Sequence, residues 1–238
     1  MKIAIIGYGK MGKAIEEIAL AKGHTIVLKI SSKNQADFIE ENIKQADVCI
    51  EFSTPETAFT HVKKCLASGV PTICGSTAWL DKYPEAIHIC ELHETAFLYA
   101  SNFSVGVNLF FKINEMVAEL MNSQADYQVS MEEIHHTAKK DAPSGTAVTL
   151  AEGILKHIQH KKAWVNEETT KENKLSIISK RIDPAPGTHT ITYKSEVDEI
   201  IINHTAHSRK GFAAGAVLAA EFIYNKKGIY TMADVLHI

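Results

Sequence analysis

The sequence lacks the features that mark several classes of protein. Its 25 lysines and arginines are balanced by 28 aspartates and glutamates, so the formal net charge is only -3. Such a chain offers no basic surface for nucleic acid and no polybasic patch for a membrane. No hydrophobic run in the sequence is long enough to span a bilayer. We therefore expect a small-molecule partner rather than a nucleic acid or a membrane.

Cysteine is also scarce. The four cysteines, at positions 49, 65, 74 and 90, form no CxxC pair and do not have the spacing of a secreted disulfide framework. Cysteines in such positions are typically small buried side chains, so we expect free thiols in a reducing compartment. The apolar run at residues 3–6 is interrupted by glycine before it reaches the length of a signal-peptide core. These patterns predict a cytoplasmic protein.

Short apolar runs alternate with helical patterns over the first hundred residues. The chain has 238 residues, of which 45% are hydrophobic, enough for one large core or two modest ones. Strands are predicted at 2–7, 25–30 and 47–52, with helices at 12–23 and 36–45 between them. This is the β-α-β-α-β order of a mononucleotide-binding half. The pattern further predicts a helix at 55–69 and strands at 71–75, 86–90 and 96–101.

The pattern changes after Asn102, where a second domain is predicted to begin. A long helix at 105–121 is followed by a strand at 127–136 and a helix after Gly145. Two β-type runs, 175–183 and 188–208, flank the turn-forming PAPG and suggest a mixed or antiparallel sheet. The prediction is an α/β chain with a Rossmann-type dinucleotide-binding domain and a smaller α+β substrate-binding and oligomerisation domain. The first domain comprises 1–103, completed by 213–238, the second comprises 104–212, and 160–174 is expected to be a solvated loop.

A glycine-rich turn follows the first predicted strand. Gly7, Gly9 and Gly12 in GYGKMG form G-x-G-x-x-G between a strand and a helix, the context that makes this short motif specific. The first glycine allows the tight turn, the second lets the backbone approach a pyrophosphate, and the third lets helix and strand pack closely. We predict dinucleotide binding. The alternative is a glycine-rich turn without a ligand.

The residues after the second predicted strand bear on cofactor choice. NAD-binding proteins usually carry a carboxylate there, which accepts hydrogen bonds from the ribose. Here Ser31 and Ser32 stand in place of an acid, and Lys33 adds a positive charge. A 2′-phosphate would meet donors and a cation, so NADPH, or use of both NADPH and NADH, is favoured over strict NADH. Alternatively, Lys33 is an ordinary loop residue.

The segment IHHTAKKDAPSGT, residues 134–146, gathers proton donors, cations and a helix start. Adjacent residues of a strand point to opposite faces, so His135 and His136 cannot both face one cleft. An imidazole can supply a proton near neutral pH, and Lys139 can hold an anionic substrate. The backbone N–H groups of Gly145 and Thr146 begin a helix, a position that favours carboxylates.

Plainer interpretations of this segment stay open. A histidine is more often structural than catalytic, and Ser144 or Thr146 could be an ordinary helix N-cap. His204 and His207 add two more imidazoles, but the chain has no Cys/His quartet and no HExxH motif. We therefore expect no metal site.

Several segments together resemble the dihydrodipicolinate reductase family, the 4-hydroxy-tetrahydrodipicolinate reductases of bacterial lysine and diaminopimelate biosynthesis. The segment 134–146 matches the family signature His-His-x-x-x-Lys-x-Asp-x-Pro-Ser-Gly-Thr at every position. The resemblance spans the whole chain and is also carried by GYGKMG, EFSTPE, CGSTAW and SNFSVGVN. The chain departs from the family at Ala78, where a glycine is common, and at the end of the second strand, which lacks the usual acid.

The resemblance implies roles for individual residues. His135 resembles the family's general acid and Lys139 its second essential cationic residue. His136, Gly145, Thr146 and Arg209 fall where the family binds the carboxylates of its substrate. Cofactor-binding positions are implied at Gly7, Gly9, Lys10, Met11, Gly12, Ser31, Ser32, Lys33, Phe52, Ser53, Gly75, Ser76, Thr77, Ser101, Asn102 and Phe103.

The implied activity is NAD(P)H-dependent reduction of a cyclic dicarboxylate. A hydride would go to C4 and a proton from His135 to C3, and the family further implies a homotetramer. Two rival functions remain open at this point. Another small reductase or amino-acid dehydrogenase would need a different substrate segment at 134–146, and a nucleotide-sensing module would keep the glycine turn but catalyse no reaction.

Overall fold

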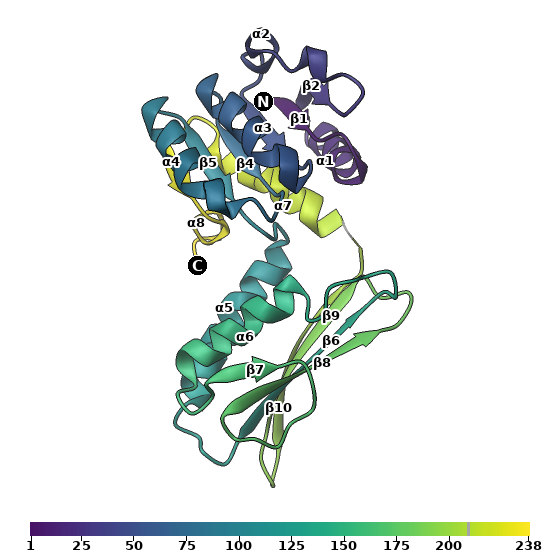
Figure 1. Cartoon of the computed structure of the whole chain (residues 1–238), viewed down its shortest axis with the longest axis vertical. Helices are drawn as coiled ribbons and strands as arrows, with labels where there is room; N and C mark the ends of the chain where they lie inside the picture. The colour runs from purple at the N-terminus through teal and green to yellow at the C-terminus, as the bar shows by residue number, and fades with distance from the viewer. Residues whose placement is uncertain (209) are drawn as a thin grey trace. The chain divides into compact units, whose positions relative to one another are not determined.

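The computed structural model describes residues 1–208 and 210–238, which form two compact units. The first comprises Met1–Val105 together with Lys210–Ile238, and the second comprises Gly106–Arg209 (Figure 1). Each unit has its own hydrophobic core. Among the described residues, no helix has both the length and the apolar character needed to cross a membrane.

The first unit is built on a six-stranded sheet in which all strands are parallel. Strands β1 and β3 pair from Ile3↔Val48 to Ile6↔Glu51, so their carboxyl ends reach the same edge of the sheet. That edge is where open α/β sheets bind ligands. The order across the sheet is β11 (Gly228–Tyr230), β5 (Ala96–Tyr99), β4 (Thr72–Cys74), β3 (Val48–Glu51), β1 (Lys2–Ile6) and β2 (Thr25–Ile30).

Helices cover both faces of this sheet, so its strands are buried on both sides. In β1, Ile3 and Ile5 belong to one core cluster and Ala4 and Ile6 to another, as the two-residue period of a strand requires. The first cluster packs under α1 (Lys10–Ala21), α7 (Lys210–Ile223) and α8 (Met232–Leu236). The opposite face is covered by α2 (Glu40–Ile43), α3 (Pro55–Ala67) and α4 (Tyr83–Leu92), and two short 3-10 helices, η1 (Gln35–Asp37) and η2 (Leu80–Lys82), complete the unit.

Some local predictions for this unit are wrong. Residues 86–90, expected as a strand, lie within α4, where Ala86, Ile89 and Cys90 face the core at helical spacing. The helix expected at 36–45 is divided between η1 and the four-residue α2. The parallel α/β arrangement itself is confirmed, and all four cysteines are free and buried as expected.

The second unit is a five-stranded mixed sheet with two long helices on one face. Strand β6 is central, parallel to β8 and antiparallel to β9. Side chains of α5 (Val105–Met121) and α6 (Gly145–His157) share one core with the sheet, and Figure 1 shows these helices side by side. The strand order is β10 (Glu199–Ala206), β9 (Gly187–Lys194), β6 (Gln128–His135), β8 (Lys174–Arg181) and β7 (Ala163–Val165).

The mixed sheet agrees with the sequence-based prediction, but the loop at 160–174 is more structured than expected. Residues 163–165 form β7, which extends the sheet beside β8. Lys161 is buried, and its Nζ lies 3.3 Å from Gln128 Oε1. This short strand was not predicted, because the many charged residues of the segment are typical of a solvated loop.

Candidate functional site

The glycine turn of the first unit has the geometry of a dinucleotide fingerprint. Gly7 has a φ of +98°, and a Cβ there would lie 2.1 Å from the Phe52 carbonyl oxygen, so a side chain cannot fit. A Cβ at Gly12 would lie 2.6 Å from the Gly7 carbonyl oxygen. No atom lies within 4 Å of the corresponding position at Gly9, the N-cap of α1, so space is open to a ligand.

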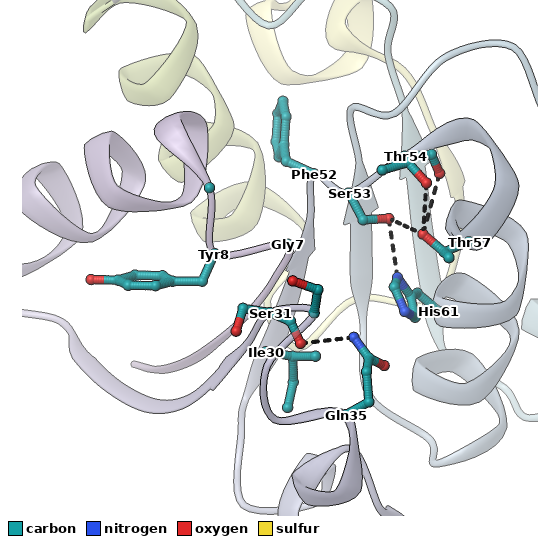
Figure 2. A pocket seen from close by; sticks show the side chains of 12 residues that line it. Gly7, Tyr8, Ile30, Ser31, Gln35, Phe52, Ser53, Thr54, Thr57 and His61 are labelled. Carbon is teal, nitrogen blue, oxygen red and sulfur yellow. Dashed lines mark hydrogen bonds between the residues drawn. The ribbon is translucent and has the colours of Figure 1, made fainter.

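A pocket of about 320 Å³ lies beside this turn (Figure 2). The predicted cofactor residues Gly7, Gly9, Ser31, Ser32, Phe52 and Ser53 contribute to its wall. The other lining residues were not predicted from the sequence, and they are Tyr8, Ile30, Gln35, Thr54, Thr57 and His61. Two of these were detectable, since Thr57 and His61 lie four residues apart in α3 and therefore share one helical face.

A buried carboxylate organises the wall at the end of β3. Glu51 is fully buried and accepts hydrogen bonds from the Ser53 backbone N–H at 2.9 Å and from the Ser53 hydroxyl. The Ser53 hydroxyl also contacts His61 Nδ1 at 3.1 Å (Figure 2). Burial opposes ionisation of Glu51, but hydrogen bonds from His61, Ser53 and Cys74 outweigh it and hold its pKa below the usual value. The pocket therefore has a fixed, polar wall.

A smaller pocket of about 220 Å³ adjoins Phe52 and Ser53. Met11, Gly75, Ser76 and Thr77, four predicted cofactor residues, line it together with Pro55. A Cβ at Gly75 would lie 2.2 Å from the Phe52 ring, so glycine is required for this packing. The two pockets share Phe52 and Ser53.

The remaining predicted cofactor residues line neither pocket. Lys10 and Ser101 are exposed, Asn102 accepts a hydrogen bond from the Ser104 backbone N–H at 2.9 Å, and Gly12 packs against Gly7. Phe103 is buried, with its ring 5.5 Å from that of Phe52. Lys33 is an exposed loop residue whose backbone N–H bonds the Ser31 hydroxyl at 3.3 Å.

The second unit gathers its predicted residues at the end of β6. His135 is the last residue of β6, and Glu133, two residues earlier, lies on the same face. The strand register places His189 of β9 directly opposite Glu133 and Arg181 of β8 opposite His135. Strand pairing therefore brings a carboxylate, two imidazoles and a guanidinium together in the fold.

The two carboxylate oxygens of Glu133 contact different partners. Oε1 accepts a hydrogen bond from the Ser144 backbone N–H at 3.0 Å and from Arg181 at 3.3 Å. Oε2 lies 3.3 Å from His135 Nδ1 and 3.7 Å from His189 Nε2. Burial opposes ionisation, but the nearby His135 imidazole and the hydrogen bond from Ser144 hold the pKa of Glu133 well below its usual value, so the carboxylate is charged.

Ser144 joins this cluster to the start of α6. Its hydroxyl caps the helix by accepting a hydrogen bond from the Ala147 N–H at 3.2 Å, and it also contacts His189 Nε2 at 3.2 Å. Burial, aided by the nearby His135 charge, lowers the pKa of His189 to about 4. His189 is therefore neutral near pH 7, even though Glu133 attracts a proton to it.

The loop between β6 and α6 carries the remaining predicted residues. Lys139 Nζ lies 2.8 Å from the Asp141 carboxylate, which is held in its charged form because this bond lowers its pKa. His136 is half-buried, Gly145 is exposed and Thr146 is half-buried at the first turn of α6. The predicted substrate residue Arg209 lies outside the described residues.

Glu133, His135 and His189 are also close enough to hold a metal ion, since their ligand atoms lie within 4.8 Å of one another. The local charges oppose this use. Arg181 already pairs with Glu133, and the Lys139 charge acts on His189.

The whole chain is similar to known proteins of one family. Residues 1–103 match the family description "Dihydrodipicolinate reductase, N-terminus" and residues 106–236 match "Dihydrodipicolinate reductase, C-terminus". A 4-hydroxy-tetrahydrodipicolinate reductase of Christiangramia forsetii is 48% identical over 99% of this chain and 98% of its own. A second, of Thermosipho africanus, is 33% identical with the same coverage.

Solved structures share the fold. A dipicolinate-bound dihydrodipicolinate reductase from Paenisporosarcina sp. TG-14 has a TM-score of 0.80 at 23% identity and covers 97% of both chains. An amine dehydrogenase from Mycobacterium smegmatis has a TM-score of 0.62 at 11% identity and covers 97% of this chain and 94% of its own. Both share the two-part α/β architecture described above.

Proposed function

The chain belongs to the dihydrodipicolinate reductase family, and from that premise we propose that it reduces 4-hydroxy-tetrahydrodipicolinate to tetrahydrodipicolinate with NADPH or NADH. The observation that carries the proposal is the segment 134–146. It is the segment that would bind and protonate a dicarboxylate, and it lies in a chain related over its whole length to reductases of this name. The reaction consumes one reduced nicotinamide and one proton and releases water.

The first unit is proposed to bind the cofactor. The open space at Gly9 and the start of α1 suit a pyrophosphate, and Ser31 and Ser32 line the pocket at the end of β2. These hydroxyls would not repel a 2′-phosphate, which supports use of NADPH. When bound, the nicotinamide supplies the hydride. The residues of this unit hold and orient the dinucleotide.

The second unit is proposed to bind the substrate. A ring with two carboxylates needs two anionic subsites, and Lys139 and the N-terminus of α6 at Gly145 and Thr146 offer complementary ones. Lys139 lies beside Asp141, and a substrate carboxylate would compete with Asp141 for its Nζ. His136 would add a further donor.

His135 is proposed to supply the proton. The substrate loses its hydroxyl as water, and a hydride then reaches C4 of the unsaturated ring. The resulting electron pair at C3 takes a proton from the His135 imidazolium, which becomes neutral. Its place at the end of β6, with a buried anion beside it, supports this role.

The proposal is tested by an assay of NADPH oxidation with 4-hydroxy-tetrahydrodipicolinate generated in the reaction mixture. We expect oxidation that depends on this substrate and is inhibited by pyridine-2,6-dicarboxylate, a planar ring with two carboxylates. An amino-acid dehydrogenase would instead oxidise NADPH with an oxo acid and ammonia. Oxidation only under those conditions, or under neither, would contradict the proposal.

A further inference from the structure

We infer that Glu133 is a positioning residue that holds His135 with Nδ1 protonated and Nε2 directed to the substrate, and that Gly187 leaves the space in which Nε2 reacts. This inference rests on the proposed function and deepens it, because it concerns the environment of the proton donor. Neither residue is proposed to touch the reacting atoms.

The contacts of Glu133 fix which imidazole nitrogen faces it. His135 Nδ1 lies 3.3 Å from Glu133 Oε2, and both atoms are buried. Among residues 1–208 and 210–238, neither atom has a hydrogen-bond partner, and their 3.3 Å approach is a charge contact rather than an aligned hydrogen bond. An anion in this place keeps a proton on Nδ1, so the proton that leaves the imidazolium comes from Nε2.

Glu133 is itself held in place from the other side. The Ser144 backbone N–H and Arg181 both contact Oε1, which leaves Oε2 for the imidazoles. Because Ser144 is the N-cap of α6, one carboxylate joins the proton donor to the helix start proposed to bind the substrate. Glu133 therefore couples the orientation of His135 to that of the anion subsite.

Gly187 provides room on the opposite side of the ring. A Cβ at this position would lie 3.0 Å from His135 Nε2 and 3.3 Å from Cδ2, which is closer than ordinary packing allows. A side chain would press on the reacting nitrogen or cover it. Gly187 begins β9, the strand that carries His189 two residues later.

Several titratable and charged groups surround Glu133 and His135. Glu133 is on β6, His189 on β9 and Arg181 on β8, while Lys139 and Asp141 come from the following loop. His189 stays neutral because burial lowers its pKa, so Glu133 has one charged imidazole partner at most, His135.

The test compares kcat and KM for Glu133→Gln, His135→Gln and the double variant, with Glu132→Gln as matched control. Glu132 is the adjacent strand residue, but its side chain is partly exposed and pairs with Lys180. We expect Glu133→Gln to lower kcat at least ~10-fold with KM for both ligands nearly unchanged, because an acid without its orienting anion transfers protons poorly. The control should retain wild-type kcat. Adding Glu133→Gln to His135→Gln should cause little further loss, because Glu133 acts through His135.

Other outcomes distinguish the positioning role of Glu133 from the proton transfer by His135. Equal loss of kcat from Glu133→Gln with and without His135 would overturn the positioning role while leaving His135 as the donor. Unchanged kcat in His135→Gln would overturn the proposed proton transfer itself.

Gly187→Ala provides a second test if Glu133→Gln fails to fold. It should lower kcat in the presence of His135 and have little effect in His135→Gln, and an equal loss in both backgrounds would overturn the role of Gly187.

Discussion

Single residues of the second unit carry the most direct predictions, because a few side chains concentrate charge in a buried place. His135 and Lys139 come from one short segment and are proposed to do different work, proton transfer and anion binding. Their substitution should therefore have different kinetic signatures.

For turnover, we predict that His135→Gln and Lys139→Ala each lower kcat/KM by on the order of a hundredfold or more. Lys139→Ala should also raise KM for the dicarboxylate, because a cation that holds the ground state is lost, whereas His135→Gln should act mainly on kcat. Steady-state kinetics with saturating NADPH distinguishes them. Near wild-type rates in both variants would remove these residues from the mechanism.

For stability, His189 predicts a dependence on pH. Its pKa is about 4 in the folded chain, against 6.5 as the ordinary value. The unfolded chain therefore binds a proton between these values that the folded chain does not, so the free energy of unfolding falls as pH drops from about 7 to 4. Denaturant titrations should show a weaker fall in His189→Asn than in wild type over that range. Parallel curves would show that His189 does not contribute.

At the scale of secondary-structure elements, the ends of helices and strands position both candidate sites. The start of α1 lies at the glycine turn, and the start of α6 is capped by Ser144. Strand β2 ends at Ile30, beside the serines proposed to face the ribose.

We predict that Ser144→Ala destabilises the chain by about 1–2 kcal/mol, because α6 loses its N-cap acceptor. Ser123→Ala, an exposed serine between α5 and β6, should change the free energy of unfolding by less than ~0.5 kcal/mol. Urea titrations measure both. Equal effects of the two substitutions would mean that the cap does not stabilise the helix.

For the cofactor, we predict comparable or better use of NADPH than of NADH. Placing a carboxylate after β2 with Ser31→Asp should reduce kcat/KM for NADPH relative to NADH by roughly 10-fold or more, through repulsion of the 2′-phosphate. Lys33→Gln tests separately whether the loop lysine takes part. A strong wild-type preference for NADH would contradict the assignment of these serines.

Elements were predictable from sequence where the signal was local. The helix at 105–121 has the predicted bounds, and the glycine turn lies between strand and helix as expected. Residues 86–90 were wrongly predicted as a strand because a short, nearly continuous apolar run also fits a helix whose buried positions are 86, 89 and 90. Glu133 and His189 escaped notice because their meeting depends on the register of β6 with β9, which no local pattern specifies.

At the scale of the whole molecule, the two units divide the proposed work. The parallel sheet of the first unit carries the glycine turn, and we propose that the end of β6 and the start of α6 in the second provide the acid and the anion subsite. The outer strand β10 of the mixed sheet also exposes apolar side chains, among them Ile200 and Ile201.

From the family we expect a homotetramer, with β10 as part of its interface. Light scattering coupled to gel filtration should give four chain masses for wild type. Ile201→Lys should lower that mass, because a buried unpaired charge opposes association, and Lys194→Gln on the neighbouring strand should not. A wild-type mass of one chain would contradict the expectation.

We propose that this chain transfers a hydride from a reduced nicotinamide to C4 of the cyclic dicarboxylate. The most direct test uses NADPH carrying deuterium at the transferred position and locates the label in the product by NMR. We predict one deuterium at C4 of tetrahydrodipicolinate for each NADPH oxidised. A product without label at C4, or NADPH oxidation that leaves the dicarboxylate unchanged, would contradict the account.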